Sequence, residues 1–299
     1  MKAMRMTRAD KVYQTAIYLI VSAILVTCVF PLIYVLGLSF TGEQEWLARG
    51  NSMIIPHEPT LAGYEKVFRQ SKVFGNSLFI SVARTLVGTG FTLSCTMCMG
   101  YILSRRDMPG VRILMFMILI TILFGGGMIP TFLVVKDTGL MDTFWAMIVP
   151  GLLDSWGVLV FRQFFMNLPR EVEESAYIDG IGEIGMMLKI VFPMSMAVLA
   201  AMGLFTAVNH WNAWFDAMIY ITDENLKPLQ LILHDLSVDA NLGYSANAGA
   251  GSVTDLASRV STRSLRMCIT VIGTVPILCV YPFLQKYFVK GVYVGAVKG

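Results

Sequence analysis

Long apolar runs alternate with short polar connections along this chain. Six runs of predominantly apolar residues cover about 13–40, 76–103, 112–135, 142–166, 194–220 and 265–288. A helix of about 20 apolar residues is long enough to cross the hydrocarbon core of a bilayer. The pattern therefore predicts an all-α membrane protein in which six transmembrane helices form one domain over residues 1–299.

The composition changes this picture little. Of the 299 residues, 56% are hydrophobic and only 14% are charged, whereas about a quarter of the residues of a soluble domain are charged. The connections leave no room for a second soluble domain. The net charge of +3 is modest, and we expect membrane lipid rather than nucleic acid around this chain.

The placement of the basic residues predicts an orientation. Many of them lie in four segments that six spans would bring to one side of the membrane: Lys2, Arg5, Arg8 and Lys11; Arg105, Arg106 and Arg112; Arg162, Arg170 and Lys189; and Lys286, Lys290 and Lys298. The connection over 41–75 also has basic residues, which weaken the bias without reversing it, because glutamates balance them: Arg49, Lys66, Arg69 and Lys72 against Glu43, Glu45, Glu58 and Glu65. By the positive-inside rule that side is the cytoplasm. We therefore expect a multi-pass membrane protein with both termini in the cytoplasm.

The connection over 169–193 is acidic and has its own helix signals. Pro169 suits a first helical turn, because its missing N–H would have no partner there. Glu171, Glu173 and Glu174 follow, where carboxylates complement the positive end of a helix dipole. Gly180 can end the helix in a left-handed conformation, and a second short helix is predicted from Gly182 toward Pro193. A helix of this kind suits a groove on a partner protein.

The same connection carries a spaced motif. It reads Glu174-Ser175-Ala176, three residues ending at Asp179, Gly180, nine residues, Ile190, Phe192 and Pro193. This resembles the cytoplasmic "EAA" loop of permease subunits of ABC importers, with Ser175 in place of alanine and Phe192 in place of leucine. The resemblance implies that Glu174, Ser175, Ala176, Asp179, Gly180, Ile190 and Pro193 couple the chain to an ATPase.

Other strings resemble the second permease subunit of carbohydrate importers, and within it the branch for complex oligosaccharides and polysaccharide fragments. They are Gly126-Gly127-Met128-Ile129-Pro130-Thr131, Asn209-His210-Trp211-Asn212-Ala213-Trp214-Phe215-Asp216-Ala217 with Pro228-Leu229-Gln230, and Tyr281-Pro282-Phe283-Leu284-Gln285 with the tail that follows. The resemblance implies a type I ABC importer permease fold. It also implies a second, homologous permease in a heterodimer, two ATPase subunits and an extracytoplasmic sugar-binding protein.

Motifs for chemistry by this chain itself are missing from the sequence. No Gly-x4-Gly-Lys-Ser/Thr segment is present to bind ATP phosphates. No two of His57, His210 and His234 have the i, i+4 spacing of a helical metal site. We therefore expect no cofactor, metal or catalytic residue in this chain, with ATP-Mg used by the partner ATPase.

Arg84, Asp154 and Asp216 are charged residues inside predicted spans. Such charges are costly in a bilayer, and usually face a cavity or an opposite charge. Arg84 and Asp216 lie at similar depth in their outer half-spans, and Asp154 lies deeper, so we expect Asp216 rather than Asp154 to pair with Arg84. The pair could line a sugar pathway or be structural, and Arg84 could instead select an anionic sugar.

Trp211, Asn212 and Trp214 are grouped in the fifth span. Aromatic rings stack on sugars and amides bind hydroxyls, so Trp211 and Asn212 are candidates for the pathway. Tryptophan also belts membrane interfaces, and that interpretation is favoured for Trp214. Residues 221–262 then form a long polar excursion, which the resemblance expects to reach toward the binding protein.

Competing interpretations differ in what they require. An ABC permease for another solute, such as a phosphorylated polyol, would share the coupling loop. An intramembrane enzyme would need a serine and a histidine, or two acids, to converge in the bundle. A secondary carrier would need an internal repeat, which the two halves of the sequence do not display.

Overall fold

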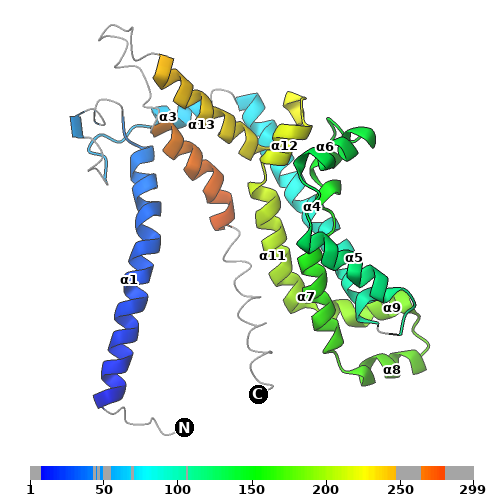
Figure 1. Ribbon diagram of the computed structural model, residues 1–299. Helices are drawn as coiled ribbons and strands as arrows, with labels where there is room; N and C mark the ends of the chain where they lie inside the picture. The colour runs from blue at the N-terminus through cyan, green and yellow to red at the C-terminus, as the bar shows by residue number, and fades with distance from the viewer. Residues whose placement is uncertain are drawn as a thin grey trace. The chain divides into compact units, whose positions relative to one another are not determined.

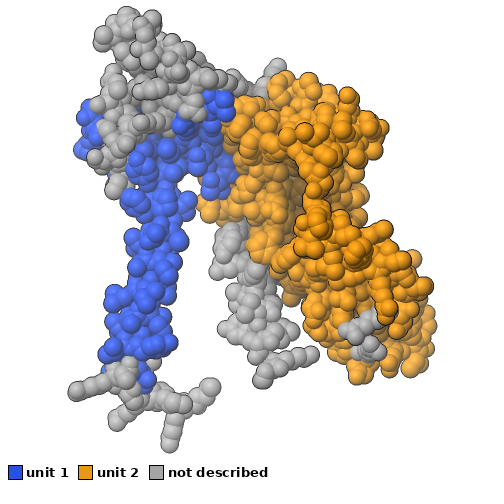
Figure 2. Space-filling model, in the orientation of Figure 1, with its two compact units in different colours: residues 1–70, 236–274 blue, residues 71–235, 275–299 orange. Residues whose placement is uncertain are grey.

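The computed structural model describes residues 8–42, 45, 48–49, 55–68, 71–105, 107–246 and 264–279. Within these ranges the regular elements are helices, apart from one isolated bridge between Thr41 and Pro59. The chain divides into two compact units, 1–70 with 236–274 and 71–235 with 275–299 (Figure 2). The predicted all-α membrane fold agrees with this architecture.

The first unit contains the first predicted span as one unbroken helix, α1 (Arg8–Ser39). Two further helices of this unit, α3 (Ala62–Phe68) and the start of Ser264–Cys279, meet the end of α1. The Ser39 hydroxyl lies 2.7 Å from the Tyr64 hydroxyl, and Ser264 donates to the carbonyl of Thr41 at 2.5 Å. Most apolar side chains along α1 are exposed, as suits a helix surrounded by lipid.

The second unit is built around α4 (Ser71–Ser104), which covers the second predicted span (Figure 1). Helices α7 (Ser155–Met166) and α11 (Met196–Asn212) pack along it. The contact is apolar: Met97 and Tyr101 of α4 meet Phe161 and Phe165 of α7 and Met202 of α11. Burial of these side chains makes α4 the central element of this unit.

The third predicted span is not one helix. The chain forms α5 (Val111–Leu123) and α6 (Met128–Asp137), with an irregular segment over 124–127. Three glycines occupy 125–127, and Gly127 begins α6 with a φ of 82°, a value that glycine adopts without steric cost. The prediction of a continuous helix over 112–135 is therefore wrong.

The fourth and fifth predicted spans are broken as well. The fourth begins as two 3₁₀ turns, η2 (Phe144–Met147) and η3 (Val149–Gly151), and bends by 52° before α7. The fifth is divided between α11 and α12 (Phe215–Tyr220) by the non-helical pair at 213–214. Only the first two predicted spans are single helices long enough to cross a membrane in the described part of the chain. Two bent pairs, Phe144–Gly151 with Ser155–Met166 and Glu183–Met194 with Met196–Asn212, could each supply one more.

The expected polar excursion is also partly wrong. After the short turn η5 (Glu224–Leu226), the chain forms α13 (Leu229–Ala246). Leu229, Leu231, Ile232 and Leu233 are buried, so the first turns of this segment belong to the folded body. Residues 247–263 lie outside the described residues, as do Lys2, Arg5, Arg106, the end of the sixth predicted span and the C-terminal string from Tyr281.

Candidate functional site

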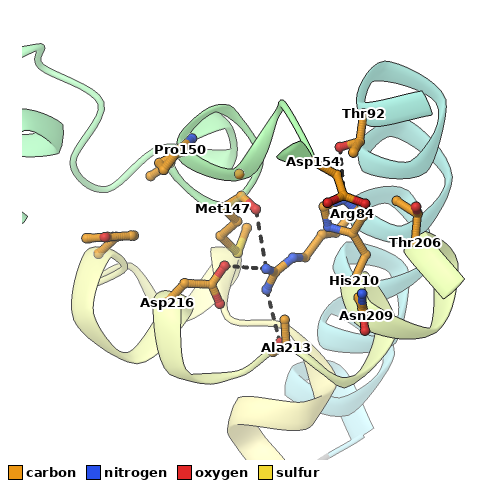
Figure 3. Close-up of a pocket in the computed structure, with 13 residues that line it drawn as sticks. Arg84, Thr92, Met147, Pro150, Asp154, Thr206, Asn209, His210, Ala213 and Asp216 are labelled. Carbon is orange, nitrogen blue, oxygen red and sulfur yellow. Dashed lines mark hydrogen bonds and ion pairs between the residues drawn. The ribbon is translucent and has the colours of Figure 1, made fainter. Parts of the chain in front are cut away.

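A cavity of about 390 Å³, lined by both polar and apolar residues, lies in the second unit. Its walls come from α4, from the 3₁₀ turns η2 and η3 with the start of α7, and from α11 and α12 (Figure 3). The lining residues are Arg84, Thr92, Ala146, Met147, Pro150, Gly151, Asp154, Thr206, Asn209, His210, Ala213, Asp216 and Tyr220. The breaks in the fourth and fifth spans thus form walls of the cavity.

Arg84 contacts several walls of this cavity at once. Its guanidinium forms an ion pair with Asp216 and donates to the carbonyls of Ala213 at 3.0 Å and Met147 at 3.3 Å (Figure 3). The Arg84 side chain is 2% exposed. The predicted pairing of Arg84 with Asp216 is confirmed, as is the expectation that Arg84 faces the interior of the bundle.

The contacts of Arg84 also explain the break in the fifth span. The Ala213 carbonyl lies just past the last turn of α11, where the negative end of a helix dipole attracts a cation. A carbonyl freed from helical pairing must be satisfied inside the membrane. Arg84 supplies donors for two such carbonyls at once, so the broken elements are stable at this depth.

Asp154 lies at the start of α7, at the bend that interrupts the fourth predicted span. Its carboxylate accepts the backbone N–H of Trp156 at 3.1 Å, as a helix N-cap does. Its own N–H donates to the Thr96 hydroxyl of α4 at 3.2 Å. The bend before α7 created this terminus and gave the carboxylate a backbone partner.

His210 is the prominent cavity residue that sequence reasoning passed over as a transport residue. Its ring lies against Gly88, where an added Cβ would approach the ring atoms to 2.7–2.9 Å. Its Nε2 lies 3.4 Å from the Thr92 hydroxyl. A signal existed, because Gly88 and Thr92 are four residues apart on α4, and Thr206 and His210 are four apart on α11.

Both tryptophans of this region lie outside the cavity lining. Trp211 is buried, Asn212 is exposed, and neither lines the cavity. Trp214 is half-buried and stacks on His234 with ring centroids 4.0 Å apart, so its ring packs within the chain. The cavity-facing polar residues of this helix are Thr206, Asn209 and His210.

The predicted coupling loop forms the helix–turn–helix that its sequence indicates. Helix α8 (Arg170–Ile178) follows Pro169, and Gly180 adopts a φ of 75°. A second helical segment then runs through α9 (Glu183–Met186), the π-helical turn η4 (Met187–Val191) and α10 (Phe192–Met194). This segment meets α11 at an 81° bend.

The motif residues divide between surface and interior. Glu174, Ser175, Asp179, Gly180 and Pro193 are exposed, whereas Ile190 is half-buried. Ala176 is only 3% exposed and packs with Met186 and Tyr101 in the apolar cluster beside α4 and α7. Ala176 is therefore buried within this chain, and Ser175 is the exposed small residue of the pair.

Comparison with known proteins identifies the family. Residues 108–292 match the family described as "Binding-protein-dependent transport system inner membrane component". The chain belongs to this family of transport permeases. It is 36% identical over 292 residues to the polygalacturonan/rhamnogalacturonan transport system permease protein YtcP of Bacillus subtilis (strain 168), covering 97% of this chain and 99% of the relative. It is 39% identical over 296 residues to the protein LplC of the same organism, covering 99% and 98%.

A solved structure supports the same assignment for this permease. It is the crystal structure of a bacterial ABC transporter involved in the import of the acidic polysaccharide alginate. One of its chains is 25% identical, with a TM-score of 0.81, over 96% of this permease and 100% of that chain. Among the residues described here, no group of three or more His, Cys, Asp or Glu side chains could hold a metal ion.

Proposed function

We propose that this chain is the transmembrane permease subunit of an ATP-driven, binding-protein-dependent importer of oligosaccharides or polysaccharide fragments. The observation that carries the proposal is the exposed α8–Gly180–α9 loop on a permease of this family. The names of the relatives support the substrate class, since they include polygalacturonan/rhamnogalacturonan and arabinooligosaccharide transport permeases. A permease of this kind moves solute and leaves hydrolysis of ATP-Mg to a separate ATPase.

The partners in this proposal are a second homologous permease, two ATPase subunits and an extracytoplasmic sugar-binding protein. Exposed Glu174, Ser175 and Asp179 provide a polar surface for an ATPase groove. Arg105 lies at the α8 end of the second unit, and Arg162 binds the Leu103 carbonyl at the end of α4. These basic residues support placing the loop in the cytoplasm of a bacterial cell, by the positive-inside rule.

The cavity is proposed as the part of the translocation pathway that this subunit supplies. Hydroxyl, amide and carboxylate groups of Thr92, Thr206, Asn209 and Asp154 line it, and such groups bind sugar hydroxyls. Arg84 already donates to two carbonyls and pairs with Asp216. The lining is therefore better suited to a hydroxyl-rich solute than to the dianionic phosphate of a polyol phosphate.

A reconstitution experiment tests this function. The cognate binding protein is first titrated by calorimetry against a panel of neutral and uronate oligosaccharides, and the bound sugars are then offered to proteoliposomes that contain the complete transporter. We expect uptake only with ATP, binding protein and a panel sugar together. Uptake that needs an ion gradient instead of ATP, or a binding protein specific for a phosphorylated polyol, would contradict the proposal.

A further inference from the structure

The coupling loop is joined by the chain to only two of the three central helices. Helix α7 leads into α8, and α10 leads into α11. Helix α4 continues toward α5 instead, so movement of the loop reaches α4 only through non-covalent contacts. Helix α4 nevertheless carries Arg84, which binds the broken elements of the cavity. Transport therefore requires a contact that makes α4 follow the loop.

A polar network centred on Arg105 provides such a contact. Arg105, the residue after the last turn of α4, donates from Nη1 to the Glu173 carboxylate of α8 at 2.8 Å. Its Nη2 donates to the Tyr101 hydroxyl and lies 3.5 Å from the Tyr177 hydroxyl. One guanidinium thus joins the end of α4 to two successive turns of α8, and its planar set of donors is suited to several partners at once.

The network extends across the turn at Gly180. The Tyr177 hydroxyl donates to the Glu183 carboxylate at 2.5 Å, which ties α8 to α9. This hydrogen bond raises the pKa of Tyr177 above its ordinary value, so the hydroxyl stays protonated and remains a donor at neutral pH. Both helices of the loop are therefore linked through Tyr177 to the same arginine.

The environment of the network suits a contact that moves. The Arg105 and Glu173 side chains are 30% and 21% exposed, so water screens their attraction and the pair can reform as the loop turns. The nearby apolar contacts of Ala176 and Met186 resist separation but give little directional control, because hydrophobic contact is non-directional. A charged hydrogen bond fixes which turn of α8 faces α4.

We propose that Arg105 is a positioning residue that transmits movement of the coupling loop to α4, and through α4 to the cavity around Arg84. The two arginines are 21 residues apart, which corresponds to about 30 Å along a helix at about 1.5 Å per residue. This inference rests on the proposed function, since it assumes an ATPase that moves α8. Beyond that function, it identifies Arg105 as the residue that transmits the movement of α8 to a membrane helix, α4.

The test compares coupling rather than activity alone. Complete transporters carrying Arg105→Gln, Glu173→Gln, both changes together, or Arg105→Lys are reconstituted, and uptake is measured per ATP hydrolysed. We expect each single Gln variant to lower this ratio at least tenfold while assembly and ATP hydrolysis stay within about twofold. The double variant should be no worse than either single variant, because residues of one pair are not additive. Lys should give an intermediate ratio.

Arg162→Gln is the matched control. Arg162 also donates to the end of α4, but its partner is the Leu103 carbonyl and not α8. Uptake per ATP hydrolysed by the Arg162→Gln transporter should therefore stay within about twofold of wild type. A wild-type ratio for Arg105→Gln, or losses in the double variant equal to the product of the single losses, would overturn the proposal. Equal losses of ratio in Arg162→Gln and Arg105→Gln would overturn it as well.

A second readout separates this inference from the choice of substrate. In a transporter whose own cysteines are replaced, Thr206→Cys places a thiol at the cavity, and a water-soluble maleimide measures its accessibility with and without ATP. We expect ATP to change the labelling rate at least threefold, and Arg105→Gln to remove that change. An unchanged response in Arg105→Gln would overturn the role of Arg105, even if no panel sugar is transported. Absent sugar uptake with an intact labelling response would count against the proposed substrate alone.

Discussion

Two arginines, Arg84 within α4 and Arg105 directly after its last turn, form ion pairs in different surroundings. Arg84 is 2% exposed and binds Asp216 together with two backbone carbonyls, whereas Arg105 is 30% exposed and binds Glu173 with two tyrosine hydroxyls nearby. Removing one partner of a buried ion pair is strongly destabilising, because the charge that remains is buried without a partner. An exposed pair contributes about 0–1 kcal/mol. The Arg84 ion pair thus holds the cavity walls together, whereas the weaker Arg105 ion pair leaves the coupling loop able to move.

The largest expected effect is on the buried pair. Arg84→Met removes the donors of the Met147 and Ala213 carbonyls and leaves Asp216 without its cation. Breaking a buried pair costs roughly 3–5 kcal/mol, and because Asp216 is 31% exposed we expect the lower end of that range. The measurement is the amount of assembled transporter and its thermal midpoint in detergent.

The double variant Arg84→Met with Asp216→Asn sharpens this prediction. It removes the stranded carboxylate, so it should assemble better than Arg84→Met alone. Normal assembly of Arg84→Met, with loss of uptake confined to uronate sugars, would show instead that Arg84 reads an anionic substrate.

A smaller effect on stability is expected at Gly88, where α4 lies against the His210 ring of α11. Gly88→Ala places a methyl group within 2.7 Å of the His210 ring, so the ring or α11 must shift. Overpacking of this kind costs about 1–3 kcal/mol. We expect a lower thermal midpoint. Gly90→Ala, on the same helix with open space at its Cβ, should leave the midpoint unchanged or slightly raised, because alanine favours a helix more than glycine does. Equal midpoints for the two variants would mean that His210 does not press on α4.

In the loop the expected defect is in coupling rather than assembly. Gly180→Val forces a β-branched residue into a left-handed conformation, at a cost of roughly 1–2 kcal/mol, and the turn between α8 and α9 should open. We expect normal assembly with uptake per ATP reduced at least tenfold. Gly182→Ala is the control, because Gly182 has a φ of −74° that any residue adopts. Normal uptake per ATP by Gly180→Val would show that coupling does not depend on the left-handed turn at Gly180.

The smallest effect on stability is expected for the exposed pair. Glu173→Gln should lower the free energy of unfolding by no more than about 1 kcal/mol, far less than Arg84→Met. Thermal midpoints of the two variants in the same detergent give the comparison. A Glu173→Gln midpoint as low as that of Arg84→Met would erase the distinction between the two pairs.

The loop was predictable because its signals are local. Pro169, the acidic first turn and Gly180 specify helix, turn and helix within a dozen residues, and the structure agrees. The burial of Ala176 was not predictable, because it depends on Met186 and Tyr101 from other elements. Spacing in a motif says which residues lie close in the chain, and not which of them face inward.

The cavity was predictable only in part. The high cost of charge in a membrane led from sequence to the Arg84–Asp216 pair. The broken spans were missed because an apolar run looks alike whether it forms one helix or two. The break at Ala213 is stabilised by Arg84, 129 residues away, and no local signal reports such a partner. Asn209 was overlooked for the same reason, since its role depends on where α11 ends, whereas the spacing of Thr206 and His210 did offer a signal for His210.

The most direct test of the account is whether the exposed face of α8 docks on an ATPase. Glu174→Cys, on an exposed position, is offered a cysteine in the groove of the cognate ATPase, and Ala176→Cys, at a buried position two residues away, is the control. The account predicts a crosslink at position 174 whose yield changes with ATP, and little or none at position 176. No crosslink at position 174, or labelling of that cysteine only from outside the cell, would contradict it.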